Sequence, residues 1–222
     1  MIISWMADGT GRFPKRPFFS LEGMDRHCER IVQLHNSRLY GQRFPGLRTD
    51  GLLRMLNDYA DVHLYEDLSK YGAGVEAVTC FKTGEKPTVR VAKELFFDRS
   101  QNNHLRFVLA HEFAHSRFHG AAWRRRWMGD GDLRRCSPNR MLTLDAGYDW
   151  LEWQANFLGA STLMPKSPLQ CVVIAYFGGE ELTGITRDSR DANNLTQRVA
   201  ELFEVSYEAA NIRLCGLGYL VG

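Results

Sequence analysis

The stretch His111-Glu112-Phe113-Ala114-His115 places two imidazoles four residues apart, with a carboxylate between them. On a helix, side chains at this spacing share one face, with Cβ atoms about 5–6 Å apart. Two histidines so placed can bind one metal ion from the same side. Glu112 then lies beside the ion, where it can act as a base toward water. The stretch therefore predicts a hydrolytic metal centre built on a helix.

The surrounding sequence supports a helix through this stretch. Ser100 can cap its N-terminus, and neither glycine nor proline interrupts residues 101–119. Apolar residues recur at helical spacing, at Leu105, Val108, Leu109 and Phe113. The alternative is a helix whose histidines face solvent or lie in the core without a metal. We favour the metal site because an unsatisfied imidazole beside an apolar surface is costly to bury.

A catalytic zinc site uses three protein ligands and leaves one position open, so a third ligand is needed. Glu152 is the candidate, in a predicted helix from about Tyr148 to Leu163 that Pro165 follows. Asn156 is four residues further along the same face and can accept a hydrogen bond from the second nitrogen of a ligand histidine. An ordinary exposed glutamate and a solvated asparagine are the alternatives at these positions.

Together the two segments resemble the ImmA/IrrE family of metallopeptidases. That family pairs an HExxHxxxH helix with a helix of the form E-x-E-A-N-x-F-A that ends in L-M-P. The corresponding stretches here are HEFAHSRFH, at 111–119, and LEWQANFLGASTLMP, at 151–165. Gln154 stands where the family often has a second carboxylate, which favours Glu152 as the ligand. Leu158-Gly159 replaces the usual Phe-Ala, and we interpret this replacement as a difference in packing.

These assignments predict a role for each residue of the site. The predicted metal ligands are His111, His115 and Glu152, and the predicted general base is Glu112. Zn²⁺ is the expected ion, although imidazole and carboxylate ligands also suit Mn²⁺. His119 continues the histidine face and, like Asn156, can contact a ligand; it can also be a histidine that the dipole favours at a helix C-terminus. The donor that stabilises the oxyanion stays open among three candidates: Tyr148, His119 and His104.

The resemblance implies a zinc-dependent endopeptidase that cleaves one regulatory protein, such as a helix-turn-helix repressor of a phage, a mobile element or a stress response. Two alternatives stay open. One is a regulator that keeps the metal site but acts by binding alone, and the other is a protein associated with a toxin–antitoxin pair. Glu112 favours an enzyme, because a purely structural metal site has no use for a base beside its ion.

The composition is that of a soluble globular protein, with 44% hydrophobic and 24% charged residues in a chain of 222. The longest apolar run, Cys171 to Phe177, is too short to span a bilayer. The five cysteines are scattered and form no CxxC pair, which indicates reduced thiols rather than disulfides. No secretory signal and no membrane partner are therefore expected, and the cytoplasm is the simplest location.

Charge gives little support for a nucleic-acid partner, because the net charge is only +2. Two segments bear on this question. A segment between residues 120 and 141 is rich in arginine, at Arg124, Arg125, Arg126, Arg134, Arg135 and Arg140, against Asp130 and Asp132. We favour a solvated loop there, and the alternative is a basic lip that recruits an acidic partner or substrate segment. The final predicted helix pair, 192–214, has helix-turn-helix length, but four acids against two bases over 191–213 disfavour DNA binding.

The rest of the chain predicts an α+β fold, in which a mainly helical, zincin-like domain carries a small, mostly antiparallel sheet beside the HExxH helix. Residues 1–20 are expected to be irregular, residues 21–180 to form the peptidase domain, and residues 181–222 to form a C-terminal helical segment for packing or docking. Further helices are expected at 24–37, 47–60, 167–176, 192–203 and 207–214. Strands are expected at 62–65, 75–81 and 88–91, the last two joined as a hairpin.

Overall fold

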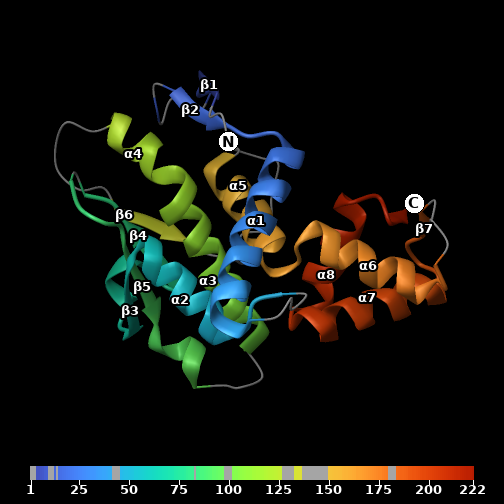
Figure 1. Cartoon of the computed structure of the whole chain (residues 1–222). Helices are drawn as coiled ribbons and strands as arrows, with labels where there is room; N and C mark the ends of the chain where they lie inside the picture. The colour runs from blue at the N-terminus through green and yellow to red at the C-terminus, as the bar shows by residue number, and fades with distance from the viewer. Residues whose placement is uncertain are drawn as a thin grey trace.

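A helix in the middle of the molecule carries the first histidine of the motif (Figure 1). α3 (Asn102–Ala114) continues through a π-helical turn (His115–His119) into α4 (Gly120–Arg126). Its buried apolar residues are those whose spacing predicted the helix: Leu105, Val108, Leu109 and Phe113. The π turn departs from the uninterrupted α-helix that we expected, and such turns are frequent at functional sites.

The computed structural model describes residues 4–9, 13, 15–41, 46–82, 84–97, 102–126, 133–136, 150–179 and 184–222. Its architecture is the mainly helical α+β fold that the sequence predicts. The predicted cap Ser100 lies outside the described residues.

Three helices surround α3, two of them in direct contact with it and the third through α5. α5 (Trp150–Leu163) lies along α3, α1 (Leu21–Tyr40) packs on α5, and α2 (Thr49–Tyr59) packs on α3 (Figure 1). Gly159 permits the close approach of α5 to α3, because a Cβ at this position would lie 3.2 Å from the backbone nitrogen of His111. The glycine at the replaced Phe-Ala position is therefore where the helices of the two motifs touch.

A four-stranded sheet packs against α3, in the order β3-β5-β4-β6. The strands are β3 (Asp61–Glu66), β4 (Ala77–Cys80), β5 (Thr88–Ala92) and β6 (Leu133–Cys136). β4 pairs antiparallel with β5 and β6, whereas β3 runs parallel to β5. The sheet is thus mostly antiparallel and includes the β4–β5 hairpin, as predicted. Single 3₁₀ turns at Ser69–Tyr71 and Lys93–Phe96 follow β3 and β5.

Part of the N-terminal segment is regular, whereas we expected residues 1–20 to be irregular. β1 (Ser4–Ala7) and β2 (Lys15–Phe18) form an antiparallel ribbon in which Trp5 lies opposite Pro17. The glycines and prolines of this segment suggested an irregular chain, yet a two-stranded ribbon has only edge strands, where proline is tolerated. β2 also contacts α4, so the ribbon is supported by the helix that follows the motif.

The C-terminal part consists of α6 (Lys166–Tyr176), α7 (Arg190–Phe203) and α8 (Tyr207–Gly216), close to their predicted positions. The serines before α7 and α8 cap these helices by accepting hydrogen bonds from backbone N–H groups. Two short strands, β7 (Ile185–Thr186) and β8 (Leu220–Val221), pair in parallel. The buried apolar residues of α7 and α8 belong to the same core cluster as those of α1 and α3 and most of those of α5. The domain boundaries at residues 20 and 180 stay predictions.

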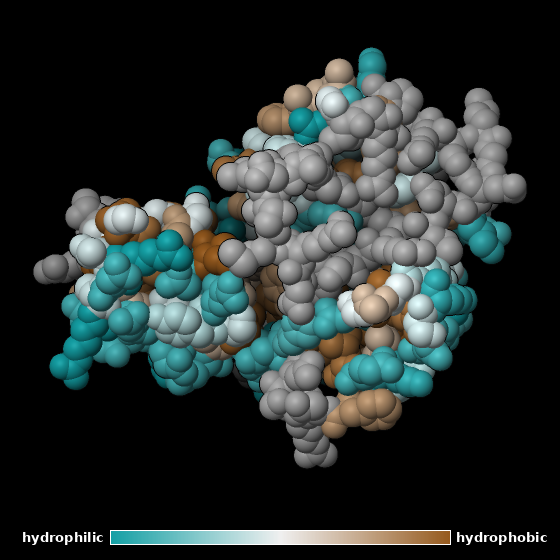
Figure 2. Space-filling model, turned by 180° about the vertical axis from the view of Figure 1, so that it is seen from behind, coloured by the Kyte–Doolittle hydropathy of each residue, from teal (hydrophilic) through white to brown (hydrophobic). Residues whose placement is uncertain are grey.

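From behind, hydrophilic residues cover most of the surface of this C-terminal part, and hydrophobic residues appear there in small groups (Figure 2). Across the described ranges, no helix has both the length and the apolar character that a bilayer span requires.

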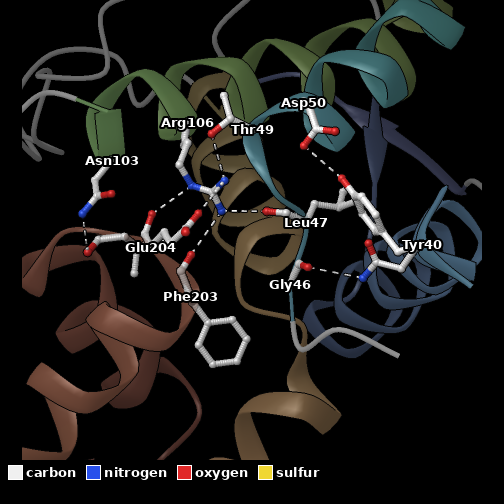
Figure 3. Close-up of polar contacts among 11 residues, drawn as sticks. Tyr40, Gly46, Leu47, Thr49, Asp50, Asn103, Arg106, Phe203 and Glu204 are labelled. Carbon is white, nitrogen blue, oxygen red and sulfur yellow. Dashed lines mark hydrogen bonds and ion pairs between the residues drawn. The ribbon is translucent and has the colours of Figure 1, made fainter. Parts of the chain in front are cut away.

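A buried arginine fixes the first half of α3 to the rest of the fold (Figure 3). The Nε of Arg106 donates to the Glu204 carbonyl at 2.9 Å, and its Nη2 donates to the carbonyls of Leu47 at 2.7 Å and Phe203 at 3.2 Å. Its Nη1 donates to Thr49 Oγ1 at 3.2 Å and lies 3.3 Å from Glu204 Oε2. This set, the Arg106 junction, joins α3 to the start of α2 and to the turn between α7 and α8.

Candidate metal centre

The two histidines and the glutamate of the predicted site lie together between α3 and α5. His111 Nε2 is 2.9 Å from His115 Nε2 and 3.1 Å from Glu152 Oε2, and His115 Nε2 is 3.4 Å from the same oxygen. Ligand atoms about 2.1 Å from one tetrahedral ion lie about 3.4 Å from one another, so these separations suit a shared ion. Among the residues that the structure describes, this is the one cluster of three such side chains close enough to hold a metal.

The burial of the three side chains differs in a way that suits a reactive site. Both histidine side chains are 1% exposed or less, whereas the Glu152 side chain is 26% exposed. The cluster therefore sits at the edge of the core, with its carboxylate side toward solvent. Two imidazoles and one carboxylate are also the donor types that zinc prefers in hydrolytic sites.

Asn156 positions the first histidine. Its Oδ1 lies 2.8 Å from His111 Nδ1 and accepts the N–H of that nitrogen, which leaves the Nε2 lone pair facing Glu152 and His115. Burial opposes a positive charge on His111, but the hydrogen bond and charge of Glu152, with smaller contributions from Glu112 and Asn156, outweigh it and raise the pKa. The site therefore attracts positive charge, as a cation site should.

Glu112 is fully buried, and its two carboxylate oxygens have different surroundings. Oε2 accepts a hydrogen bond from the hydroxyl of Thr79 on β4, whereas Oε1 is buried with no hydrogen-bond partner among the described residues. A buried carboxylate oxygen without a partner is costly, so it calls for a functional explanation. A carboxylate oxygen without another partner, on the residue next to the candidate ligand His111, is what a general base needs.

Thr79 was not predicted from the sequence as a site residue. The signal that points to it is weak: it is a polar side chain in β4, where Ala77 and Val78 are also fully buried. A buried hydroxyl in such a strand needs a hydrogen-bond acceptor, and here the acceptor is Glu112.

His119 lies next to the second histidine, on the side away from His111, and the role expected for it stays a prediction. Its Nδ1 is 3.0 Å from His115 Nδ1, and its Nε2 is 3.2 Å from Gln154 Oε1. Gln154 is fully buried and faces His119, so it does not share the position of Glu152. This arrangement agrees with Glu152, the first of the two α5 positions, as the candidate ligand.

Of the other candidates for the oxyanion donor, His104 is not part of the cluster. His104 Nε2 lies 2.7 Å from Glu76 Oε1, and this hydrogen bond raises the pKa of His104. At 1.5 Å of helix rise per residue, His104 is displaced from His111 by about 10 Å along α3, which disfavours it as an oxyanion donor. Tyr148 lies outside the described residues, so its role stays a prediction.

The arginine-rich segment is more regular than the loop that we expected over residues 120–141. It begins as α4, which ends at Arg126, and it contains β6, which pairs with β4. Arg140 and the acidic residues Asp130 and Asp132 lie outside the described residues. Both explanations of the arginines, a solvated segment and a basic lip, stay predictions.

Comparison with known protein families agrees with this geometry. The model of the IrrE N-terminal-like domain, peptidase family M78, matches residues 98–215, which is more than half of the chain. The matched range contains α3, α5 and all three candidate ligands. No curated protein matches the chain.

Proposed function

The chain belongs to the IrrE N-terminal-like family of metallopeptidases, and we propose that it is a zinc-dependent endopeptidase that cuts a specific regulatory protein in the cytoplasm. One observation carries the proposal. Three ligand-type atoms, from His111, His115 and Glu152, converge beside a buried glutamate whose second oxygen has no hydrogen-bond partner among the described residues. A structural metal site would need no such oxygen.

Each residue of the cluster has a distinct task under this proposal. Zinc held by His111, His115 and Glu152 would supply Lewis acidity, which polarises the scissile carbonyl and makes water more acidic. Glu112 Oε1 accepts the proton of the attacking water and later delivers it to the leaving amine. Thr79 holds Oε2, which leaves Oε1 available for the proton.

The proposed substrate class follows from the resemblance of two sequence segments to a known family. The paired segments at 111–119 and 151–165 resemble enzymes that cleave one regulatory protein, and a helix-turn-helix repressor is the substrate that we propose. The competing hypothesis is a regulator that binds such a protein without cutting it. The unpartnered Oε1 of Glu112 favours cleavage.

The proposal is tested with the purified full chain and a helix-turn-helix repressor encoded beside its gene. We expect one molar equivalent of zinc in metal analysis and a discrete cut in the repressor, which a chelator abolishes. The Glu112→Gln variant should retain zinc and lose the cut, because removing a general base costs about 10²–10⁴-fold in rate. Glu208→Gln, at an exposed position on α8, is the matched control and should cut normally.

Two outcomes would contradict the proposal. Cleavage that persists in the Glu112→Gln variant would remove the assigned base. A stable complex that wild-type, zinc-loaded protein never cuts would support the non-cleaving regulator.

A further inference from the structure

We propose that Gln154 and the backbone carbonyl of Pro17 act through His119 to set the tautomer of His115, so that the Nε2 lone pair of His115 is available to the metal. The inference rests on the proposed function, because it assigns His115 as a ligand. It makes Gln154 a positioning residue and gives the N-terminal ribbon a part in the site.

The two neighbours of the Gln154 side-chain amide fix its orientation. Gln154 Nε2 lies 3.2 Å from the Pro17 carbonyl oxygen, and both residues are buried. A carbonyl oxygen can only accept, so the amide group that faces it must be the NH₂. The Gln154 oxygen therefore points to the opposite side, where it lies 3.2 Å from His119 Nε2.

The orientation of the amide in turn determines which nitrogens of His119 and His115 carry a proton. The Gln154 oxygen only accepts, so His119 Nε2 carries the proton. A neutral imidazole has one N–H, and His119 Nδ1 is then an acceptor, 3.0 Å from His115 Nδ1. The two rings are inclined to each other in a T-shaped arrangement, with an interplanar angle of 65°. His115 Nδ1 must therefore donate, which leaves a lone pair on Nε2.

The outcome at His115 matches the one at His111, although the routes differ. Asn156 sets the tautomer of His111 in one hydrogen bond, whereas His115 depends on the three-part chain of His119, Gln154 and Pro17. Both Nε2 atoms consequently face the same space, 2.9 Å apart. Hydrogen-bonded partners of ligand histidines typically change metal affinity by 10–100-fold.

This series of hydrogen bonds also explains why a glutamine suits position 154. A carboxylate there would accept the His119 N–H equally well, but its second oxygen would face the Pro17 carbonyl, oxygen against oxygen. The amide satisfies both neighbours at once. Gln154 and the β1–β2 ribbon are therefore a matched pair, and the ribbon lies outside the family-matched range 98–215.

The test measures the His115 tautomer directly, by ¹⁵N–¹H correlation spectra of metal-free protein labelled in histidine, at about pH 8.5 where imidazoles are neutral. Wild type should show His115 protonated at Nδ1. Gln154→Leu should give a mixture of tautomers and weaken zinc binding, measured by chelator competition, by about 10–100-fold. Gln154→Glu keeps the acceptor for His119 and should retain the wild-type tautomer, with a lower melting temperature. Gln170→Leu, at an exposed glutamine on α6, should behave as wild type.

The outcomes separate this inference from the proposed function. Wild-type protein with His115 protonated at Nε2 overturns the inference without any variant, even if Gln154→Leu does not fold. Unchanged tautomer and zinc affinity in folded Gln154→Leu also overturn it. Wild-type protein that shows the expected tautomer but binds no zinc supports the hydrogen-bond chain and contradicts the proposed function.

Discussion

The two ends of α3 carry buried polar groups whose hydrogen bonding is completed to different degrees. At the Arg106 junction, five polar contacts serve the five N–H groups of the guanidinium. Near the other end, Glu112 Oε1 is buried without a hydrogen-bond partner among the described residues, and three ligand-type atoms crowd together. A complete hydrogen-bond network stabilises the fold, whereas buried polar atoms that lack partners are available to bind a metal ion or a substrate.

This comparison predicts opposite responses to substitution at the two ends of the helix. Groups at the Arg106 junction should govern the free energy of unfolding and leave chemistry untouched. Groups near the HExxH motif should govern metal binding or turnover, with little cost in stability.

The largest effect is expected for Arg106→Met. Losing the guanidinium leaves the buried carbonyls of Leu47 and Phe203 without their donor, which costs about 1–3 kcal/mol for each, so the free energy of unfolding should fall by about 2–6 kcal/mol. Urea denaturation in the presence of chelator measures this loss. Arg198→Met, at an exposed arginine on α7, is the control and should change stability by less than about 0.5 kcal/mol. A loss near that of the control would show that the junction does not hold the fold.

The second effect concerns the metal. Glu152→Ala removes one of three candidate ligands, so zinc affinity should fall by more than about 100-fold, beyond what outer partners contribute. The metal-free protein should unfold at nearly the same urea concentration as wild type, because the Glu152 side chain is partly exposed. Glu208→Ala provides the control. If zinc affinity were unchanged, Glu152 would not be a ligand.

The candidate metal site at one end of α3 could be predicted from the sequence, whereas the Arg106 junction at the other end could not, for a physical reason. Two histidines that face one ion from the same helix recur at a spacing such as i and i+4, so the candidate ligands His111 and His115 leave a pattern that spacing reveals. Arg106 bonds mainly to backbone carbonyls 59 to 98 residues away, and a carbonyl is present at every residue, so no pattern marks it. Likewise, the Pro17 carbonyl reaches Gln154 across 137 residues.

The third effect is on turnover alone. Thr79→Val preserves the shape of the side chain and removes the hydroxyl that holds Glu112 Oε2. We expect kcat/KM for repressor cleavage to fall about tenfold, the effect of losing one hydrogen bond to a charged group, with zinc affinity unchanged. The control is Thr196→Val, a buried threonine whose hydroxyl bonds within α7. A parallel loss of zinc affinity would instead assign Thr79 to the metal site.

The smallest effect is expected for His104→Gln, a variant that tests whether this histidine of α3 contributes to stability alone. The hydrogen bond to Glu76 raises the pKa of His104, so the folded protein binds this proton more tightly than the unfolded chain does. The stabilisation is therefore fully present below the unfolded pKa of about 6.5, and it is lost as pH rises through the folded value. His104→Gln should lower the free energy of unfolding more at about pH 6 than at about pH 8.5, by a few tenths of a kcal/mol because the pair is partly exposed. An equal loss at both pH values would mean that the ion pair adds nothing, and altered zinc affinity in this variant would place His104 with the site rather than with the scaffold.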